Sequence, residues 1–166
     1  MTMRVGLGYD IHPLTENRQL ILGGIEIPHH KGLAGHSDAD ALTHAICDAL
    51  LGALGEGDIG SRFPSSDPSF KNISSMLLLE NVQTLVTSKG YSLLNVDTVV
   101  IAQAPRLASH LPAIRARIAT ALDIEQQRIN VKVKSGEGVG GIGREEAIAA
   151  HAVCLLTTTP STPTTP

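Results

Sequence analysis

Apolar residues recur with a helical period in three segments of the chain. In the segment 36–53, five apolar residues follow the pattern i, i+3, i+4, i+7 and i+8 and predict a helix with one face in a core: Leu42, Ala45, Ile46, Ala49 and Leu50. Ser37 followed three residues later by Asp40 resembles a capping box, so we expect this helix to begin near Ser37. The same period predicts helices over 74–89 and 112–122.

Runs with alternating or β-branched residues predict strands between these helices. Residues 4–9 are expected to form a short strand whose glycines allow another element to approach its backbone. The segment 19–27 has a glycine pair at its centre and predicts a tight hairpin. The segment 95–103 is typical of a central strand, and 129–134 alternates like a half-exposed strand. The run 147–156 is so rich in alanine that its periodicity fits either a helix or a strand.

Length and composition predict a single domain, and we expect the protein to reside in the reducing cytoplasm. The 166 residues suffice for a single domain over 1–156, followed by a Thr/Pro-rich tail, 157–166, that we expect to be disordered. A net charge of -3 with scattered basic residues argues against a nucleic-acid partner. We expect no membrane partner, because no apolar run has membrane-spanning length and the N-terminus lacks the pattern of a signal peptide. The two cysteines form no CxxC pair.

A candidate metal site combines the first strand with the first helix. Asp10 and His12 lie two residues apart, so an extended chain places them on the same face. Asp40, His44 and Asp48 follow i+4 steps along the predicted non-core face of the helix. Taken alone, this helix favours a simpler interpretation, in which Asp40 stabilises the positive N-terminus and His44 and Asp48 face water. Together, however, the first pair and His44 make three O/N ligands with one position open, which suits a catalytic divalent metal, zinc first.

Two glycine-rich segments are expected to be loops. The segment 55–68 is too rich in glycine, proline and small polar residues for regular structure, and it leaves the end of the ligand-bearing helix. The segment 135–144 follows a predicted strand and could direct N–H groups at an anion. It lacks the ending of a Walker loop and the spacing of a dinucleotide fingerprint, so it predicts no particular ligand by itself.

Eight motifs, in chain order from about residue 4 to 156, carry a resemblance to a known family: Gly8-Tyr9-Asp10-Ile11-His12, His36-Ser37-Asp38, His44, Gly57-Asp58-Ile59-Gly60, Phe63-Pro64, Asp67-Pro68, Ala102-Gln103-Ala104-Pro105 and Gly143-Arg144. The sequence resembles the 2-C-methyl-D-erythritol 2,4-cyclodiphosphate synthase family of the non-mevalonate isoprenoid pathway. The resemblance implies an α/β (α+β) subunit with a mixed β-sheet packed against helices. It also implies a homotrimer with active sites between subunits, and a final strand at 147–156.

The resemblance further implies a lyase that acts on a cytidine-diphosphate substrate. Such an enzyme converts 4-diphosphocytidyl-2-C-methyl-D-erythritol 2-phosphate into the cyclic diphosphate and CMP by metal-assisted intramolecular phosphoryl transfer. Zinc would be held by Asp10, His12 and His44, and a second ion, Mg²⁺ or Mn²⁺, by Glu137. His36 and Ser135 would stabilise the transition state.

The remaining residues matched by the resemblance are implied to bind substrate. The methylerythritol pocket would consist of Asp58, Ile59, Gly60, Phe63, Pro64, Ser65, Ser66 and Asp67. The cytidine and α-phosphate side would consist of Ala102, Gln103, Ala104, Pro105, Arg106, Leu107, Ala108 and Lys134. Asp48 would bond the ribose, and Arg144 would lie near the trimer axis. The substrate-binding set is completed by Ser37, Gly136 and Gly141.

One segment departs from the family pattern. Where the family commonly has Thr-Thr-x-Glu-Lys-Leu-Gly-Phe, this chain has Lys-Ser-Gly-Glu-Gly-Val-Gly-Gly at 134–141. We hypothesise retained activity with altered affinity on the cytidylyl side or in the central cavity. Two alternatives to a synthase are a zinc phosphodiesterase that activates water and a non-catalytic trimeric scaffold with a structural zinc.

Overall fold

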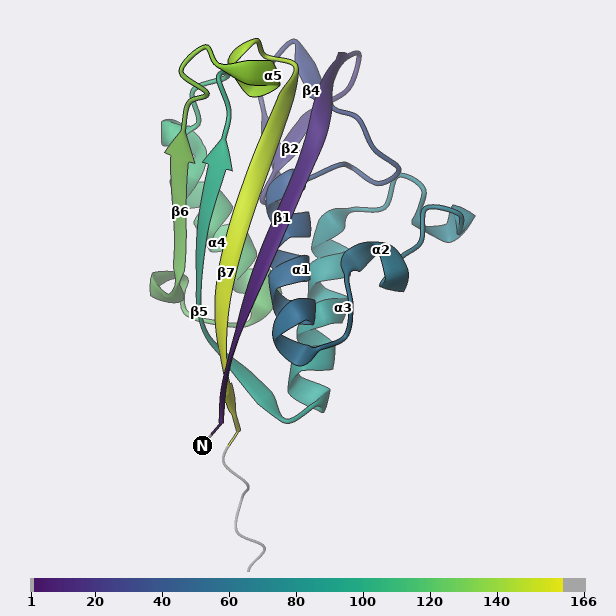
Figure 1. Ribbon diagram of the computed structural model, residues 1–166, viewed down its shortest axis with the longest axis vertical. Helices are drawn as coiled ribbons and strands as arrows, with labels where there is room; N and C mark the ends of the chain where they lie inside the picture. Colours follow the sequence, from purple (N-terminus) through teal and green to yellow (C-terminus); the bar gives the residue numbers. More distant parts are fainter. Residues whose placement is uncertain (1, 160–166) are drawn as a thin grey trace, which may run out of the picture.

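A five-stranded mixed sheet organises the computed structural model, which describes residues 2–159 (Figure 1). The strand order is β4-β1-β7-β5-β6, with β5 and β6 parallel and the other pairs antiparallel. The strands are β1 (Met3–Glu16), β4 (Lys31–Leu33), β5 (Tyr91–Ile101), β6 (Ile129–Lys134) and β7 (Ala147–Thr158). The run whose periodicity was ambiguous is therefore a strand, as the family resemblance implied, and it lies at the centre of the sheet.

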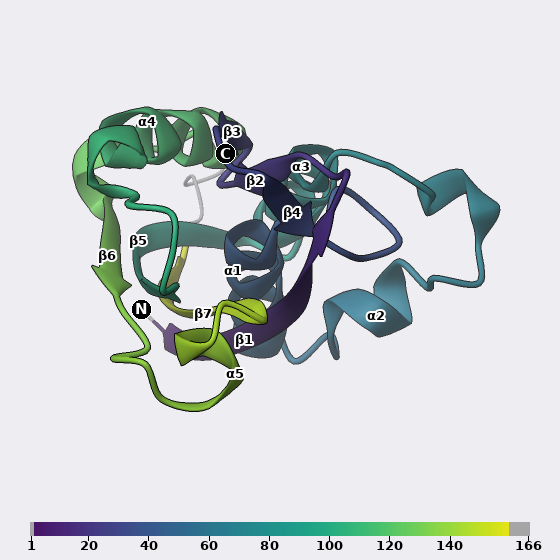
Figure 2. The same cartoon turned by 90° about the horizontal axis from the view of Figure 1, so that it is seen from above.

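Helices cover one face of this sheet, as seen from above in Figure 2. The three long helices are α1 (Ala41–Leu54), α3 (Ser75–Ser88) and α4 (Leu111–Leu122). All five apolar positions predicted to face the core from α1 are fully buried. The predicted hairpin forms from β2 (Leu20–Leu22) and β3 (Ile25–Ile27). No helix among the described residues has both the length and the apolar character needed to cross a membrane.

Two glycines of β1 allow α1 to lie directly on the strand backbone. A Cβ atom at Gly6 would be 1.8 Å from the carbonyl oxygen of Ala49, and one at Gly8 would be 1.9 Å from that of Ala45. Any side chain at these positions would push the helix away. The glycines therefore set the short distance between β1 and α1 that the candidate metal site requires.

The opposite face of β1 and β7 carries apolar side chains that are exposed in the described part of the chain. Val5 and Leu7 are each 69% exposed. The same face includes four further exposed apolar residues: Met3, Tyr9, Ile11 and Val153. An apolar surface of this kind on a sheet typically marks an interaction site.

The predicted start of the first helix was wrong. The helix begins at Ala41 with Asp40 as its N-cap, and Ser37 lies before it. Asp40 is fully buried rather than solvent-facing, because its carboxylate accepts hydrogen bonds from the N–H groups of Thr43, Gly23 and Gly24 at 3.0, 2.9 and 2.7 Å. It ties the hairpin turn to α1 and does not belong to a row of ligands.

Other boundaries also differ from the predictions. The first strand continues through Asp10 and His12 to Glu16, because β4 and β7 pair along its length. The predicted loop 55–68 contains α2 (Ile59–Arg62) and the start of a 3₁₀ turn, η1 (Pro68–Phe70). The remaining short helices are η2 (Ala108–His110), η3 (Gln126–Arg128) and α5 (Gly140–Gly143). β7 extends to Thr158, two residues into the predicted tail, and positions 160–166 lie outside the described residues.

Candidate functional site

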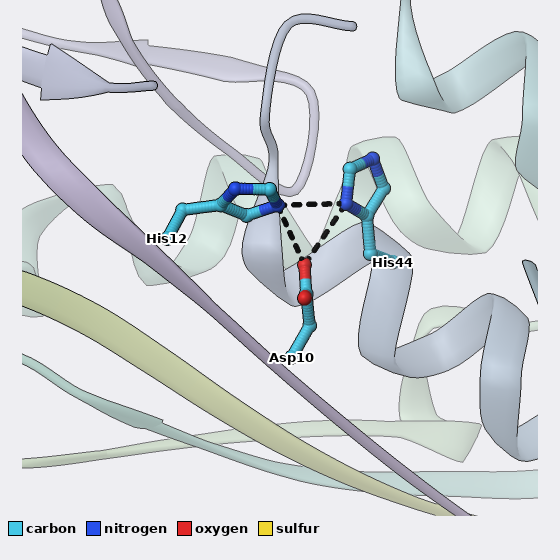
Figure 3. A group of neighbouring side chains, drawn as sticks. All are labelled: Asp10, His12 and His44. Atoms are coloured by element: carbon cyan, nitrogen blue, oxygen red, sulfur yellow. Dashed lines mark hydrogen bonds and ion pairs between the residues drawn. The ribbon is translucent and has the colours of Figure 1, made fainter. Parts of the chain in front are cut away.

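Asp10, His12 and His44 converge as predicted (Figure 3). Oδ2 of Asp10 lies 2.9 Å from Nε2 of His12 and 2.9 Å from Nδ1 of His44. The two imidazole nitrogens are 3.2 Å apart. β1 presents the first two side chains toward α1, and the first turn of α1 supplies the third. We call these three residues the triad.

The donor set of the triad fits a divalent metal ion. A tetrahedral ion about 2.0–2.1 Å from each ligand requires ligand atoms roughly 3.3 Å apart, close to the observed separations. Two imidazole nitrogens and a carboxylate oxygen are ligands that zinc accepts, and three protein ligands leave a fourth position open.

Burial and hydrogen bonding shift the pKa values of Asp10 and His12 in opposite directions. Burial favours the neutral form of Asp10, but its hydrogen bonds with His12 and His44 outweigh burial and hold the pKa of the carboxyl far below its usual range. Burial also favours the neutral ring of His12, but the hydrogen bond and charge of Asp10 prevail and raise the pKa of that imidazole. The carboxylate is therefore ionised and available as a ligand.

The ring nitrogens that face away from the triad also have partners. Nδ1 of His12 donates to the carbonyl oxygen of Ala34 at 2.9 Å. Nε2 of His44 lies 2.8 Å from the hydroxyl of Ser75 and 3.2 Å from that of Ser37. Sequence reasoning missed Ser75, which is separated from His44 by 31 positions, and no spacing in the chain connects the two.

A cavity of about 430 Å³ opens beside the triad, and we call it the triad cavity. The predicted site residues that line it with the triad are His36, Ser37, Ile59, Gly60, Phe63, Pro64, Ser65 and Ser66. Nε2 of His36 donates to the carbonyl oxygen of Asp67 at 3.3 Å. Asp58 does not line the cavity; it caps α2, where its carboxylate accepts from the N–H of Ser61 at 2.7 Å.

Asp48 links α1 to the edge of the triad cavity. Its carboxylate accepts a hydrogen bond from the N–H of Ile59 at 2.7 Å. Burial raises the pKa of this carboxyl, although the bond to Ile59 opposes the rise. Asp48 therefore helps to position α2, a role that the sequence did not predict.

Most residues predicted for the cytidine and α-phosphate side surround a second cavity, of about 630 Å³, which we call the β6 cavity. Its lining includes Ala102, Gln103, Pro105, Arg106, Leu107, Ala108, Lys134 and Ser135. These residues lie at or after the ends of β5 and β6, and β6 is at the opposite edge of the sheet from β4 (Figure 2). One chain therefore places most of the predicted substrate residues in two separate cavities.

The glycine-rich segment after β6 is held by backbone hydrogen bonds, such as that from the N–H of Gly143 to the carbonyl oxygen of Val139 at 3.0 Å, and by a few side-chain contacts. The Ser135 hydroxyl donates to Glu137 at 2.7 Å, and the N–H of Gly138 donates to the side chain of Gln103 at 3.3 Å. Arg144 forms an exposed ion pair with Glu146 at 2.8 Å. Gly136 and Gly141 lie in the same loop, and neither lines the triad cavity.

The mixed sheet covered by helices on one face, with an Asp-His-His triad at a cavity, defines an α/β protein with a candidate catalytic metal centre. The family model described as the YgbB family matches residues 3–157, and the chain belongs to this family.

Named relatives are similar over nearly the whole chain. A protein from Clostridium botulinum named 2-C-methyl-D-erythritol 2,4-cyclodiphosphate synthase is 54% identical over 154 residues, covering 93% of this chain and 99% of that protein. A structure of Plasmodium falciparum IspF in complex with CDP superposes with a TM-score of 0.84 at 38% identity, covering 95% of this chain and 97% of that one. The bifunctional IspDF of Campylobacter jejuni superposes with a TM-score of 0.91 at 42% identity. The superposition covers 95% of this chain and 42% of that longer chain.

Proposed function

We propose that the protein converts 4-diphosphocytidyl-2-C-methyl-D-erythritol 2-phosphate into 2-C-methyl-D-erythritol 2,4-cyclodiphosphate and CMP, in the cytoplasm. The observation that carries the proposal is that a chain 54% identical to a named synthase also assembles the triad at a cavity. The comparisons do not favour a zinc phosphodiesterase or a non-catalytic scaffold.

The reaction is an intramolecular phosphoryl transfer. An oxygen of the 2-phosphate forms a bond to the β-phosphorus. The bond from this phosphorus to the oxygen that bridges to the α-phosphate breaks, and CMP leaves with the electron pair. Because the 2-phosphate is anionic near neutral pH, no side chain has to act as a general base, and catalysis depends on positioning and charge stabilisation.

The side chains of the triad would bind a zinc ion through two nitrogens and one oxygen. When bound, zinc supplies a Lewis acid for a phosphate oxygen. The exposed carboxylate of Glu137 would hold a second ion, Mg²⁺ or Mn²⁺, because hard cations prefer oxygen ligands. Ser135, which donates to this carboxylate, and His36, which lines the triad cavity, would donate to phosphate oxygens in the transition state.

The two cavities would bind different parts of the substrate. The residues of α2 and the following loop that line the triad cavity would contact the methylerythritol. The β6 cavity would bind the cytidine, with Lys134 near the α-phosphate. Asp48, which uses one carboxylate oxygen for Ile59, would offer the other to a ribose hydroxyl.

A homotrimer would unite the two cavities into active sites between subunits. The placement of the cavities toward different edges of one sheet supports this assembly, and so does the exposed apolar face of β1 and β7. Arg144 would then lie near the axis, where three copies attract an anion. Leu7→Asp should dissociate the assembly, since it introduces a charge into the apolar face, and light scattering would detect subunits of monomer mass. A monomeric wild-type protein would contradict the arrangement.

Phosphorus NMR with the authentic substrate tests the activity. We expect a cyclic diphosphate and CMP in the presence of Zn²⁺ and Mg²⁺. An acyclic phosphate product would instead identify a phosphodiesterase, and zinc binding without release of CMP would identify a scaffold.

A further inference from the structure

The two histidines of the triad are oriented in different ways. His12 donates its outer N–H to a backbone carbonyl, that of Ala34 at 2.9 Å. His44 instead faces a side-chain hydroxyl, that of Ser75 at 2.8 Å. A carbonyl oxygen can only accept, so the proton of His12 is placed on Nδ1 and Nε2 is left for a metal. A hydroxyl can donate or accept, so Ser75 alone would not place the proton of His44.

The carboxylate of Asp38 removes this ambiguity. The hydroxyl of Ser75 donates to Oδ1 of Asp38, and the backbone N–H of Ser75 donates to Oδ2 at 2.9 Å. An ionised carboxylate only accepts, so the hydroxyl proton of Ser75 points to Asp38 and its oxygen lone pairs are free for His44. When a metal takes the place of the hydrogen bond between Nδ1 of His44 and Asp10, Nε2 therefore carries the ring proton and Nδ1 keeps its lone pair for the metal.

We infer that Ser75 and Asp38 are positioning residues that orient His44 for metal binding through Nδ1. The chain of contacts runs from the Asp38 carboxylate to the Ser75 hydroxyl, the His44 imidazole and the open centre of the triad. Ser75 is fully buried, so water does not compete for these hydrogen bonds. The inference deepens the metal site of the proposed function and rests on that site, but not on turnover.

Ser37 is the competing partner of the same nitrogen. Its hydroxyl is farther from Nε2 of His44, at 3.2 Å, and its oxygen also accepts the N–H of Ala39 at 3.1 Å. No carboxylate contact of Ser37 is found in the described part of the chain. Ser75 therefore has the stronger geometry for fixing the ring.

Zinc affinity, measured by competition with a chromogenic chelator, tests the inference without substrate. Ser75→Ala keeps the backbone bond to Asp38 and should weaken zinc binding about 10- to 100-fold, the usual effect of removing the partner of a ligating histidine. Thr98→Val is the matched control, since it removes a buried hydroxyl that donates to the carbonyl oxygen of Asn130, away from the triad. Its zinc affinity should stay within about twofold of wild type.

Asp38→Asn tests the direction of the hydrogen bonds. The amide can keep accepting the N–H of Ser75 only by turning its NH₂ toward the Ser75 hydroxyl. That hydroxyl would then donate to His44 and oppose the ring proton that zinc binding requires, so affinity should fall at least as far as in Ser75→Ala. If Asp38→Asn does not fold, Ser75→Ala decides the matter, with its fold verified by circular dichroism.

Proton NMR of the zinc-loaded protein provides a second readout. The Nε2–H of His44 should give a downfield signal that exchanges slowly in the wild type and is lost in Ser75→Ala. Zinc affinity of Ser75→Ala within about twofold of wild type, persistence of this signal, or loss of affinity in Ser37→Ala instead, would each overturn the inference. Failure to form the cyclic diphosphate while zinc binds normally would contradict the proposed function and leave this test intact.

Discussion

The triad cavity and the β6 cavity differ in how their polar side chains are held. The triad is at least half-buried, and each histidine uses its second ring nitrogen in a hydrogen bond to another part of the chain. Around the β6 cavity, Lys134, Ser135 and Glu137 are exposed, and the bond between the last two lies within the loop itself. The polar groups of the triad cavity are held by contacts within the chain, whereas those of the β6 cavity are exposed to solvent.

This difference has a packing origin. The triad lies where α1 packs directly on the backbone of β1 at Gly6 and Gly8. Its potential metal-ligand atoms are therefore held by closely packed backbone. The β6 cavity lies at the edge of the sheet, beside a loop with glycines at 136, 138, 140, 141 and 143. Pre-organised ligands suit metal binding, and exposed polar groups are accessible to a substrate.

The largest expected effect comes from removing a ligand of the triad. His44→Ala should abolish zinc binding and lower turnover about a thousandfold or more, because the Lewis acid contributes several kcal/mol to the transition state. Elemental analysis and the phosphorus NMR assay would measure the two losses. His30→Ala, at an exposed position, is the matched control and should retain both zinc and turnover. Full turnover by metal-free His44→Ala would contradict the view that the triad cavity differs from the β6 cavity in supplying a metal site.

The next effect tests the packing of α1 on β1. The methyl group of Gly8→Ala would lie 1.9 Å from the carbonyl oxygen of Ala45. This clash would force the helix to move and carry His44 away from Asp10. We expect a loss of about 3 kcal/mol in the free energy of unfolding, with weaker zinc binding. Denaturant titration would measure the stability.

Gly52→Ala, in the same helix, is the control for this change. A Cβ at Gly52 meets its nearest neighbour, the carbonyl oxygen of Leu7, at an ordinary 3.8 Å. Unchanged stability and zinc affinity in Gly8→Ala would mean that the close approach of α1 to β1 does not determine the positions of the triad side chains.

A smaller effect is expected in the β6 cavity. Lys134→Thr introduces the residue common in the family and removes a positive charge, so the affinity for CDP should fall about tenfold, or 1.4 kcal/mol, while zinc affinity is unchanged. Calorimetry would measure both, with Lys71→Thr as an exposed control. Equal CDP affinity in wild type and in a variant with Lys134→Thr and Gly141→Phe would refute the hypothesis of altered nucleotide binding.

The smallest effect concerns an exposed ion pair at the β6 edge. The hydrogen bond from Lys132, at 2.6 Å, lowers the pKa of Asp97, so this carboxylate stabilises the fold at neutral pH and loses that contribution as the pH falls through its lowered pKa. Lys132→Ala should return the pKa toward its ordinary value and cost less than about 1 kcal/mol, because both side chains are about half exposed. NMR titration of Asp97 would show the change, and an unaltered titration would contradict it.

Local pattern was sufficient for most of the elements and for the triad. The strand at 129–134 and the hairpin around Gly23 and Gly24 form as predicted, because their periodicity and turn chemistry are local properties. Asp10, His12 and His44 were identified from their residue types and spacing, and they meet in the structure. The run 147–156 could not be assigned from periodicity, since both faces of this strand carry apolar residues, with Val153 exposed on the face away from the helices, so polar and apolar residues do not alternate.

The sequence by itself thus determined which residues could bind a metal, because residue type and position on a strand or a helix depend on neighbouring residues in the chain. Only the tertiary structure decided that Asp40 would be buried against the hairpin, that Ser75 would reach His44, and that most of the predicted substrate residues would divide between two cavities. These outcomes depend on contacts between segments distant in the sequence, and no local period encodes which buried polar groups will meet across the core.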